Sequence, residues 1–586
     1  MRNRGRAAIA LLVSLSFIAA ACGDDDDDSS AGTEAGATTP AATDAPAATD
    51  APADSVATTD GGTATTEGAT ADTGATTPDD GSVPAGTEVD CDLPYEDGDP
   101  DANVDFITSV PPRQFDPHIS TSIIGEYAYI AAVYDRLIEQ RKGPVLCPMI
   151  AESWEFNDDG TELTLHLDPD AVFWDGSPID AEAVKANLTR AQTLETSTVK
   201  SFLNMVTAIN VVDPQTVTLV ANRPAADLPS TLSTLVGSMI NPKAFTDGTD
   251  LATTPAGSGA YEIQDWVVND NVTFVRKDDY WRPESAGKAK TLHYVGIPDD
   301  LNKLNAFRSG EADISFFKAA SYGDFSDYAE STEGVSIAQY PQGATYQIFL
   351  NTDRPGLDNQ QVRQALNYAI DRDAINEELL YGQCPPTSQM LQGIYPGHLP
   401  ELDDYYNYDP EKAQQLLDEA GFSDGFSFEI GAGAGLTPQA LFGPVIQAQL
   451  APLGIDVTVT EGDLLDINSR WAAGELDAYA QTRLGAADAG VVLRDNYTKG
   501  SRFPGTPPQE VTDAINATLD PTVTGDDRTA LLEAANTLIT EQALDLFICG
   551  TSATFIHTDD VLNADIMGQA DYQGIFDMRY VTMSGS

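Results

Sequence analysis

Basic residues are scarce in this chain of 586 residues. It has 31 Lys+Arg against 91 Asp+Glu, which gives a formal net charge of −60. A nucleic-acid-binding protein needs a basic face that displaces counterions from phosphates, and docking on an anionic membrane surface needs basic clusters as well. The charge balance therefore argues against nucleic acid as a partner and against electrostatic docking on a membrane.

Cysteine and histidine are also few, with 5 of each. No C-x-x-C pair occurs, which argues against a zinc ribbon or a thioredoxin-like site. The histidines include no pair at i, i+4, so the helix of a zinc protease is excluded at motif level. The chain has neither a G-x-S-x-G elbow nor a Walker A sequence. The sequence thus predicts no catalytic residues, no metal site and no cofactor.

One glycine-rich stretch imitates a dinucleotide-binding site. Residues 429–443 (EIGAGAGLTPQALFG) are typical of a strand, a turn and a helix, and Glu461 follows the next strand. The third glycine of the fingerprint is replaced by Leu436, however, and Thr437-Pro438 is typical of a helix cap with a first-turn proline. We interpret the stretch as a structural turn.

Long apolar runs are missing except at the N-terminus. Residues 1–22 (MRNRGRAAIALLVSLSFIAAAC) combine a basic start, a short apolar run and small residues. This pattern is typical of a secretory signal and is too short to span a membrane comfortably. Small residues directly before Cys22 resemble a bacterial lipobox, although Ala19 stands where a branched residue is usual. We expect Cys22 to be lipidated, and ordinary secretion without a lipid is the alternative.

The next segment, residues 23–90, contains neither an aromatic nor a basic residue. It consists mostly of Ala, Thr, Gly, Asp, Pro and Ser. Such a chain cannot bury enough apolar area to offset the entropy lost on ordering, so we expect a disordered acidic tether. The tether would hold the folded part at a distance from the membrane that anchors its end.

The rest of the chain alternates short strands with amphipathic helices. The hydrophobic content of 42% suffices for a packed core, and the length allows three or four domain-sized units. Alternation and apolar stripes predict strands over 161–167, 216–220 and 272–277, and helices over 362–374, 409–421 and 531–546. This interleaving argues for an α/β fold.

Several blocks, in a fixed order, carry a resemblance to a known family. The most specific is VRQALNYAIDRDAI at 362–375. The others are FDPHIS (115–120), VYDRLI (133–138), MIAESWEFNDDGTELTLHL (149–167), VFWDGSPIDAEAVKANLTR (172–190), PAGSGAYEI (255–263), DDYWR (278–282), FRSGEADI (307–314), IFLNTDRPGLDN (348–359), YDPEKAQQLLDEAGF (408–422) and IQAQLAPLGIDVTV (446–459). Together they resemble the family 5 extracellular solute-binding proteins, the dipeptide-, oligopeptide- and nickel-binding components of bacterial ABC importers.

The resemblance implies a bilobal type II periplasmic-binding fold with an additional small domain. The expected divisions are the signal at 1–22, the tether at 23–90, lobe I at 91–135, 256–345 and 553–586, the extra domain at 136–255, and lobe II at 346–552. Two crossings between the lobes would form a hinge that a ligand closes, because the ligand touches both lobes only in the closed state.

The predicted secretion and domain divisions also suggest how the cysteines pair. Without Cys22, four remain in an oxidising compartment, so two disulfides are plausible and three pairings are possible. We favour Cys91–Cys147 and Cys384–Cys549, since each pair then joins segments assigned to neighbouring elements.

The resemblance also suggests where a ligand would lie. The implied cleft walls are the segment with Ser120, the GSGAY turn with Ser258 and Tyr261, and the crossing with Tyr346 and Asn351.

The loop after the strand at 476–481 completes the implied walls. In peptide-binding members a carboxylate there receives the peptide's amino group. In the corresponding stretch TRLGAADAGVVL (482–493), this carboxylate is either lost at Ala486 or replaced by Asp488. Arg470 could meet a ligand carboxylate, and a surface ion pair is the alternative.

We therefore expect a monomeric bacterial lipoprotein that is not an enzyme, anchored through an N-terminal lipid at the outer face of the cytoplasmic membrane. It would bind a small solute, a peptide or peptide-like molecule, and deliver it to an ABC permease and ATPase. A secreted hydrolase and a surface sensory or adhesion module that retains the fold are the alternatives.

Overall fold

The structure is a computed structural model that describes residues 91, 95–120, 125–500, 502–567 and 577–585. The predicted signal with Cys22 and the predicted tether lie outside the described residues. Within the described part of the chain, no helix is long and apolar enough to cross a membrane.

One large mixed sheet organises most of the described residues. Its strands are β1 (Asn103–Thr108), β8 (Tyr261–Val267), β9 (Asn271–Arg276), β10 (Thr291–Gly296), β11 (Ile314–Phe317), β12 (Val335–Leu350), β13 (Ser427–Gly433), β14 (Asp456–Gly462), β15 (Ala478–Arg483) and β16 (Asp545–Thr558). They form a 10-stranded sheet in the order β14-β13-β15-β12-β16-β11-β1-β10-β9-β8. We use "lobe I" for the part around β1 and β8 to β11, and "lobe II" for the part around β13 to β15.

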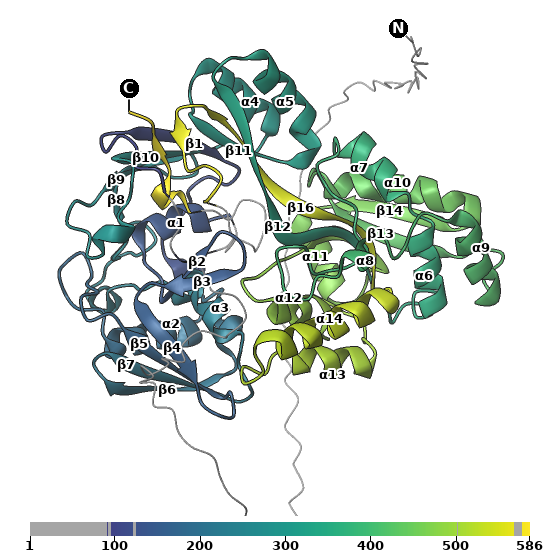
Figure 1. Ribbon diagram of the computed structural model, residues 1–586, viewed down its shortest axis with the longest axis horizontal. Helices are drawn as coiled ribbons and strands as arrows, with labels where there is room; N and C mark the ends of the chain where they lie inside the picture. Colours follow the sequence, from purple (N-terminus) through teal and green to yellow (C-terminus); the bar gives the residue numbers. More distant parts are fainter. Residues whose placement is uncertain (1–90, 92–94, 121–124, 501, 568–576, 586) are drawn as a thin grey trace, which may run out of the picture. The chain divides into compact units, whose positions relative to one another are not determined.

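The two central strands, β12 and β16, are shared by both lobes (Figure 1). They have 16 and 14 residues and pair antiparallel from Val335 opposite Thr558 to Phe349 opposite Asp545. The register shifts between Pro341 and Thr345, which marks a bulge in β12. The domain boundaries predicted at 345/346 and 552/553 both fall inside these strands, so the two crossings are continuous β structure.

Helices accompany the strands in each lobe. Lobe I has α1 (Tyr127–Val133), α4 (Asp300–Ser309) and α5 (Tyr322–Ser331). Lobe II has α6 (Gln360–Tyr368), α7 (Arg372–Leu379), α8 (Pro400–Asp403), α9 (Pro410–Glu419), α10 (Gln439–Leu450), α11 (Leu464–Ala472), α12 (Ala489–Tyr497), α13 (Gln509–Ala517) and α14 (Gly525–Glu541). The start of α9 follows the sequence prediction, because Asp409 accepts a hydrogen bond from the Lys412 backbone N–H and Pro410 occupies the first turn.

Three predictions about helices need correction. The helix expected over 362–374 is two helices, since Asp371 caps a new one by accepting a hydrogen bond from the Ala374 backbone N–H. The helix expected over 531–546 ends at Glu541, and the following residues enter β16. Pro438 rather than Thr437 occupies the cap position of α10, and no side chain caps that helix.

The small domain has its own sheet and core. Its strands β4 (Ala151–Phe156), β5 (Glu162–Leu167), β6 (Val206–Asp213) and β7 (Thr216–Ala221) form a sheet in the order β4-β5-β7-β6, beside the hairpin of β2 (Ile138–Arg141) and β3 (Val145–Pro148). The helices α2 (Ala181–Thr193) and α3 (Leu228–Leu232) contribute to a separate hydrophobic cluster with these strands. The strands predicted at 161–167, 216–220, 272–277 and 476–481 correspond to β5, β7, β9 and β15.

Two disulfide bonds tie distant segments together. Cys91 is bonded to Cys147 in β3, and Cys384, after α7, is bonded to Cys549 in β16; the Cα–Cα distances are 5.8 and 5.4 Å. This is the pairing that we favour from the sequence. Two short strands near the C-terminus, β17 (Val561–Leu562) and β18 (Thr582–Met583), pair antiparallel.

Candidate ligand-binding site

The strand directions of the two lobes indicate where a ligand can bind. In lobe I, β1 runs parallel to β10 and β11, and in lobe II, β13 runs parallel to β14 and β15. Ligands of open α/β sheets bind in the crevice outside the carboxyl ends of parallel strands. Here β10 and β11 end at Gly296 and Phe317 before α4 and α5, and β13 ends at Gly433 before α10.

A pocket of about 300 Å³ lies at these strand ends and has walls from both lobes. We call it the interlobe pocket. Lobe I contributes Pro298, Asp299, Asp300, Leu301, Leu304, Lys318, Ser321, Asp324 and Phe325, and lobe II contributes Gly435 and Thr437. Its volume is at the lower end of the range that small-molecule sites occupy.

Two of the carboxylates in the interlobe pocket are engaged within the protein. Asp299 caps α4 by accepting a hydrogen bond from the Asn302 backbone N–H. Asp300 forms an ion pair of 2.8 Å with Lys303 and accepts a hydrogen bond of 2.8 Å from the Ser321 hydroxyl. Burial lowers the pKa of Lys303, and the Asp300 carboxylate opposes this effect.

Unlike Asp300, two other charged side chains of the pocket lining, Lys318 and Asp324, have no ion-pair partner among the described residues. Asp324 is also exposed. The interlobe pocket therefore offers one ammonium and one carboxylate that solvent or a ligand can pair with.

The bulge of β12 lies against Tyr395 of lobe II. A side chain at Gly343 would collide with Tyr395. The Tyr395 hydroxyl donates a hydrogen bond of 2.8 Å to the Ala486 carbonyl oxygen and accepts one of 3.0 Å from the Ala486 backbone N–H. The loop after β15, which the resemblance places at the ligand, is thus linked to the bulge through Tyr395.

A buried ion pair beside this loop was not predicted from the sequence. Arg483, at the end of β15, contacts both carboxylate oxygens of Asp545 at 2.8 Å, and neither side chain is exposed. The guanidinium also lies 3.6 Å from the centre of the Phe349 ring. Burial raises the pKa of Asp545, and Arg483 limits that rise. The pair joins β15 to β16 and supports the hinge strands.

The predicted site residues of lobe I are engaged in structural contacts. The Ser120 hydroxyl donates a hydrogen bond of 2.7 Å to Glu126, and the Ser258 hydroxyl accepts one of 3.3 Å from the Asp135 backbone N–H. The Tyr261 hydroxyl donates one of 2.9 Å to the Ala289 carbonyl oxygen. All three side chains are buried.

The predicted site residues on the crossing strand are also buried. Tyr346 packs against Phe442 with ring centroids 5.6 Å apart. The Asn351 amide donates hydrogen bonds to the carbonyl oxygens of Gly474 and Leu476. Neither residue lines the interlobe pocket.

The two predicted charged site residues already have partners. Asp488 caps α12 by accepting a hydrogen bond from the Val491 backbone N–H, and both its carboxylate oxygens contact Arg528 at 2.9 and 2.6 Å. Arg470 contacts Glu429 at 3.3 Å, which matches the ion-pair alternative. The structure thus spreads the predicted site residues over several contacts and does not gather them in one pocket. Their part in binding a solute stays a prediction.

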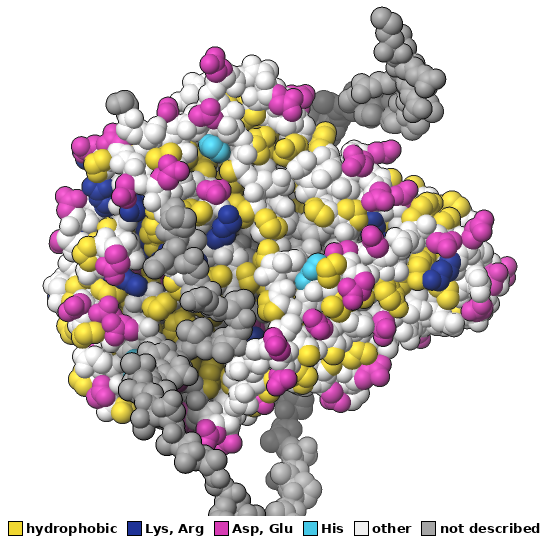
Figure 2. All heavy atoms as spheres, in the orientation of Figure 1, with side chains coloured by type: hydrophobic (Ala, Val, Ile, Leu, Met, Phe, Trp, Pro, Cys, Tyr) yellow, Lys and Arg dark blue, Asp and Glu magenta, His cyan; other side chains and the backbone are white. Residues whose placement is uncertain are grey.

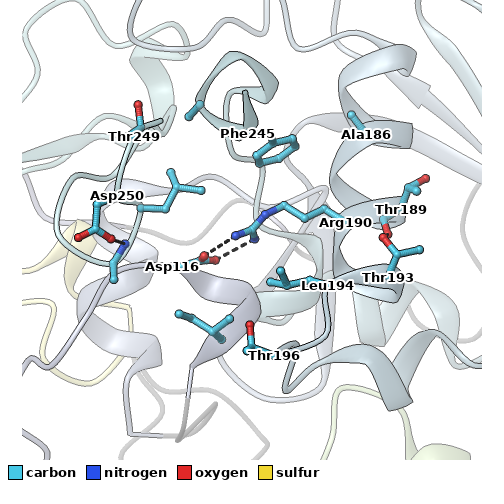
Figure 3. A pocket seen from close by; sticks show the side chains of 14 residues that line it. Asp116, Ala186, Thr189, Arg190, Thr193, Leu194, Thr196, Phe245, Thr249 and Asp250 are labelled. Carbon is cyan, nitrogen blue, oxygen red and sulfur yellow. Dashed lines mark hydrogen bonds and ion pairs between the residues drawn. The ribbon is translucent and has the colours of Figure 1, made fainter. Parts of the chain in front are cut away.

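A second pocket, of about 640 Å³, lies between lobe I and the small domain (Figure 3). We call it the side pocket. Asp116 and Arg190 meet in it through two hydrogen bonds of 3.0 and 2.5 Å, and Phe245 lies over the guanidinium. Arg190 also contacts the buried imidazole of His118 at 2.7 Å; burial and this guanidinium lower the pKa of His118 to about 4. The guanidinium in the lining of the side pocket is therefore already paired, whereas the exposed carboxylate of Asp250, also in the lining, accepts hydrogen bonds, among the described residues, only within its own loop.

Two lobes joined by two long shared strands define a type II periplasmic-binding fold. Solved structures have the same fold: DppA from Helicobacter pylori in complex with the peptide STSA (19% identity, TM-score 0.69, 82% of this chain and 98% of that chain) and NikA from Brucella suis in complex with Fe(III)-EDTA (23%, 0.70, 83% and 100%).

Sequence comparison narrows this class to one family. The chain belongs to the bacterial extracellular solute-binding proteins, family 5, whose model matches residues 146–502. The glutathione-binding protein GsiB of Escherichia coli K12 is 28% identical over 355 residues, which cover 59% of this chain and 67% of GsiB. The resemblance found in the sequence is confirmed. The chain is a solute receptor of an ABC importer that acts outside the cytoplasm, and its relatives are binding proteins, not enzymes.

Proposed function

We propose that this receptor binds a short peptide or a peptide-like zwitterion between its lobes and passes it to its permease and ATPase. It does so as a monomer, held at the outer face of the cytoplasmic membrane by a lipid on Cys22. The relatives that bind glutathione and a tetrapeptide support this solute class.

The observation that carries the proposal is the pair of opposite charges in the interlobe pocket. A short peptide with uncharged side chains, such as trialanine, has one carboxylate and one ammonium. Lys318 suits the carboxylate and Asp324 suits the ammonium, since both lie in the lining and neither has an ion-pair partner among the described residues. The side pocket makes no comparable offer, because the guanidinium in its lining, that of Arg190, is already paired with Asp116.

Solute binding is coupled to closure of the hinge. A solute in the interlobe pocket contacts α4 and α5 from one lobe and the turn before α10 from the other. Such a solute favours the closed arrangement, because only that arrangement provides both sets of contacts. Under this proposal, lobes I and II and the small domain have the divisions predicted from the sequence, with the hinge in β12 and β16.

Identification of the co-purified solute by native mass spectrometry tests the solute class directly. Calorimetric titration with dialanine, trialanine and glutathione then measures affinity. We expect Lys318→Gln to weaken binding about tenfold, the cost of one charge-assisted hydrogen bond. Lys185→Gln, on the exposed surface of α2, is the matched control.

Three results would speak against the proposal. One is a co-purified sugar or other uncharged solute, and another is unchanged affinity in Lys318→Gln. Turnover of peptides by the purified protein would favour the secreted hydrolase instead. Lipidation is tested separately, by the mass of the N-terminal peptide of membrane-bound protein and by release of the Cys22→Ala variant into the medium.

A further inference from the structure

An ion pair connects the small domain to lobe II outside the hinge strands β12 and β16. Asp227 immediately precedes α3 in the small domain, and its side chain is fully buried. One of its carboxylate oxygens accepts a hydrogen bond from Arg494, which lies in α12 of lobe II and is 19% exposed. The two residues are 267 positions apart in the sequence.

A second contact lies beside this ion pair. The turn at Gly160 abuts Pro521, between α13 and α14, so closely that a side chain at position 160 would collide with the proline ring. The same turn is fixed to the Asp227 segment, because the Ala225 backbone N–H donates a hydrogen bond of 2.9 Å to the Gly160 carbonyl oxygen. The small domain therefore presents one continuous surface to lobe II.

The charges on both sides keep a partner when this contact opens. Asp227 contacts Arg223 at 2.7 and 3.1 Å within the small domain, and Arg494 contacts Asp495 at 2.8 Å within α12. Removing one partner of a buried ion pair normally leaves an uncompensated charge at high cost. Here, separation of the lobes leaves two intact pairs, so the contact can form and break at small cost.

We propose that Asp227 and Arg494 form a latch that holds the small domain against lobe II when the lobes close. The inference rests on the proposed hinge closure and adds a contact remote from the solute. The latch does not contact the ligand. It increases the population of the closed state, and it therefore raises the apparent affinity for every solute by the same factor.

Distances between spin labels test the latch without knowledge of the natural solute. Labels on Val212→Cys in β6 and Asn516→Cys in α13 report the separation of the small domain and lobe II; both native residues are exposed. Double electron–electron resonance is recorded on the full chain, with and without trialanine. We expect Arg494→Gln to raise the long-distance population about fivefold, the scale of a partly exposed ion pair.

Two further variants sharpen the result. Asp227→Asn should open the lobes to the same extent, and the double variant should add nothing, because both changes remove one interaction. Arg354→Gln is the matched control, since its partner Asp477 lies in the same lobe; it should leave the distances unchanged. Arg494→Gln alone decides the test if Asp227→Asn does not fold.

Identical distance distributions in the wild type, Arg494→Gln and Arg354→Gln would overturn the latch, and so would equal opening in Arg494→Gln and the control. The hinge is judged separately. If trialanine shortens the distance but Arg494→Gln and the wild type have the same distances before trialanine is added, closure stands and the latch is wrong. A single distance that neither trialanine nor any variant changes contradicts both proposals.

Discussion

The side pocket and the interlobe pocket differ in what their charged residues already do. The side pocket has about twice the volume, 640 against 300 Å³, but its guanidinium already binds the Asp116 carboxylate, which leaves only the Asp250 carboxylate without an ion-pair partner among the described residues. The interlobe pocket is small, yet Lys318 and Asp324 form no ion pair with other described residues. A pocket can select a zwitterion only with groups of both signs that its own fold has not neutralised, so the smaller pocket is the better candidate for a peptide.

The surface charge of the protein does not affect the comparison of the two pockets. Figure 2 shows acidic side chains scattered over both halves of the visible face, with few basic ones among them. Scattered and exposed carboxylates remain hydrated and favour solubility. The excess of acidic residues therefore says little about the solute, and the individual pockets must supply that information.

The largest expected effect comes from breaking the pair in the side pocket. Arg190→Ala removes the guanidinium from Asp116, whose side chain is 4% exposed, and leaves a buried carboxylate without its cation. We expect the free energy of unfolding to fall by about 3 kcal/mol. Urea denaturation measures this loss.

The affinity for trialanine should stay at the wild-type value in Arg190→Ala, because the side pocket is structural in this comparison. A weakened affinity together with unchanged stability would mean that the roles of the two pockets are reversed.

A smaller effect separates two carboxylates within the interlobe pocket. Asp300→Asn takes the anion away from the buried Lys303 ammonium, which lies 2.8 Å from it, and should lower the free energy of unfolding by about 2 kcal/mol. Asp324→Asn changes an exposed group and should leave stability within about 0.5 kcal/mol while it weakens trialanine binding.

Asp327→Asn, exposed on the same helix one turn further along and outside the pocket lining, is the control for Asp324→Asn. Parallel measurement of denaturation and calorimetry on these variants checks the distinction. Equal losses of affinity in Asp324→Asn and Asp327→Asn would show only a general effect of charge.

These cases also show how far the sequence could lead. The apolar stripe of Val362, Ala365 and Leu366 is local information, and these residues are buried as the stripe predicts. The order of the family blocks likewise allowed the bilobal fold to be predicted from the sequence. The break after α6 was missed because the stripe continues through it, while the polar cap at Asp371 decides where the next helix begins.

The candidate site depended on contacts between distant segments, which no local pattern reports. The Asn351 amide is occupied by a carbonyl oxygen 125 residues away, and Asp488 by an arginine 40 residues away. Lys318 shares a pocket with Thr437 only because β11 and β13, which run in opposite directions, both end toward the middle of the shared strand β12. A signal was present in hindsight for lobe I alone, since the polar Lys318 directly follows β11.

An effect that builds up gradually with falling pH concerns the side pocket. His118 is buried, and its pKa is lowered from 6.5 to about 4. The unfolded chain therefore binds a proton at His118 between pH 6.5 and 4 that the folded protein does not bind. Stability falls as the pH falls through this range, at a limiting slope of about 1.4 kcal/mol per pH unit from this residue.

His118→Gln removes this term but keeps a polar side chain that can contact Arg190. Other carboxylates titrate in the same range, so the difference between the wild type and the variant is the quantity to measure. We expect the wild type to lose stability faster than His118→Gln in urea denaturation at pH 6.5, 5.5 and 4.5. Parallel curves would show that the imidazole accepts its proton in the folded state, and that the Asp116–Arg190 pair is more open to solvent than the geometry of the side pocket implies.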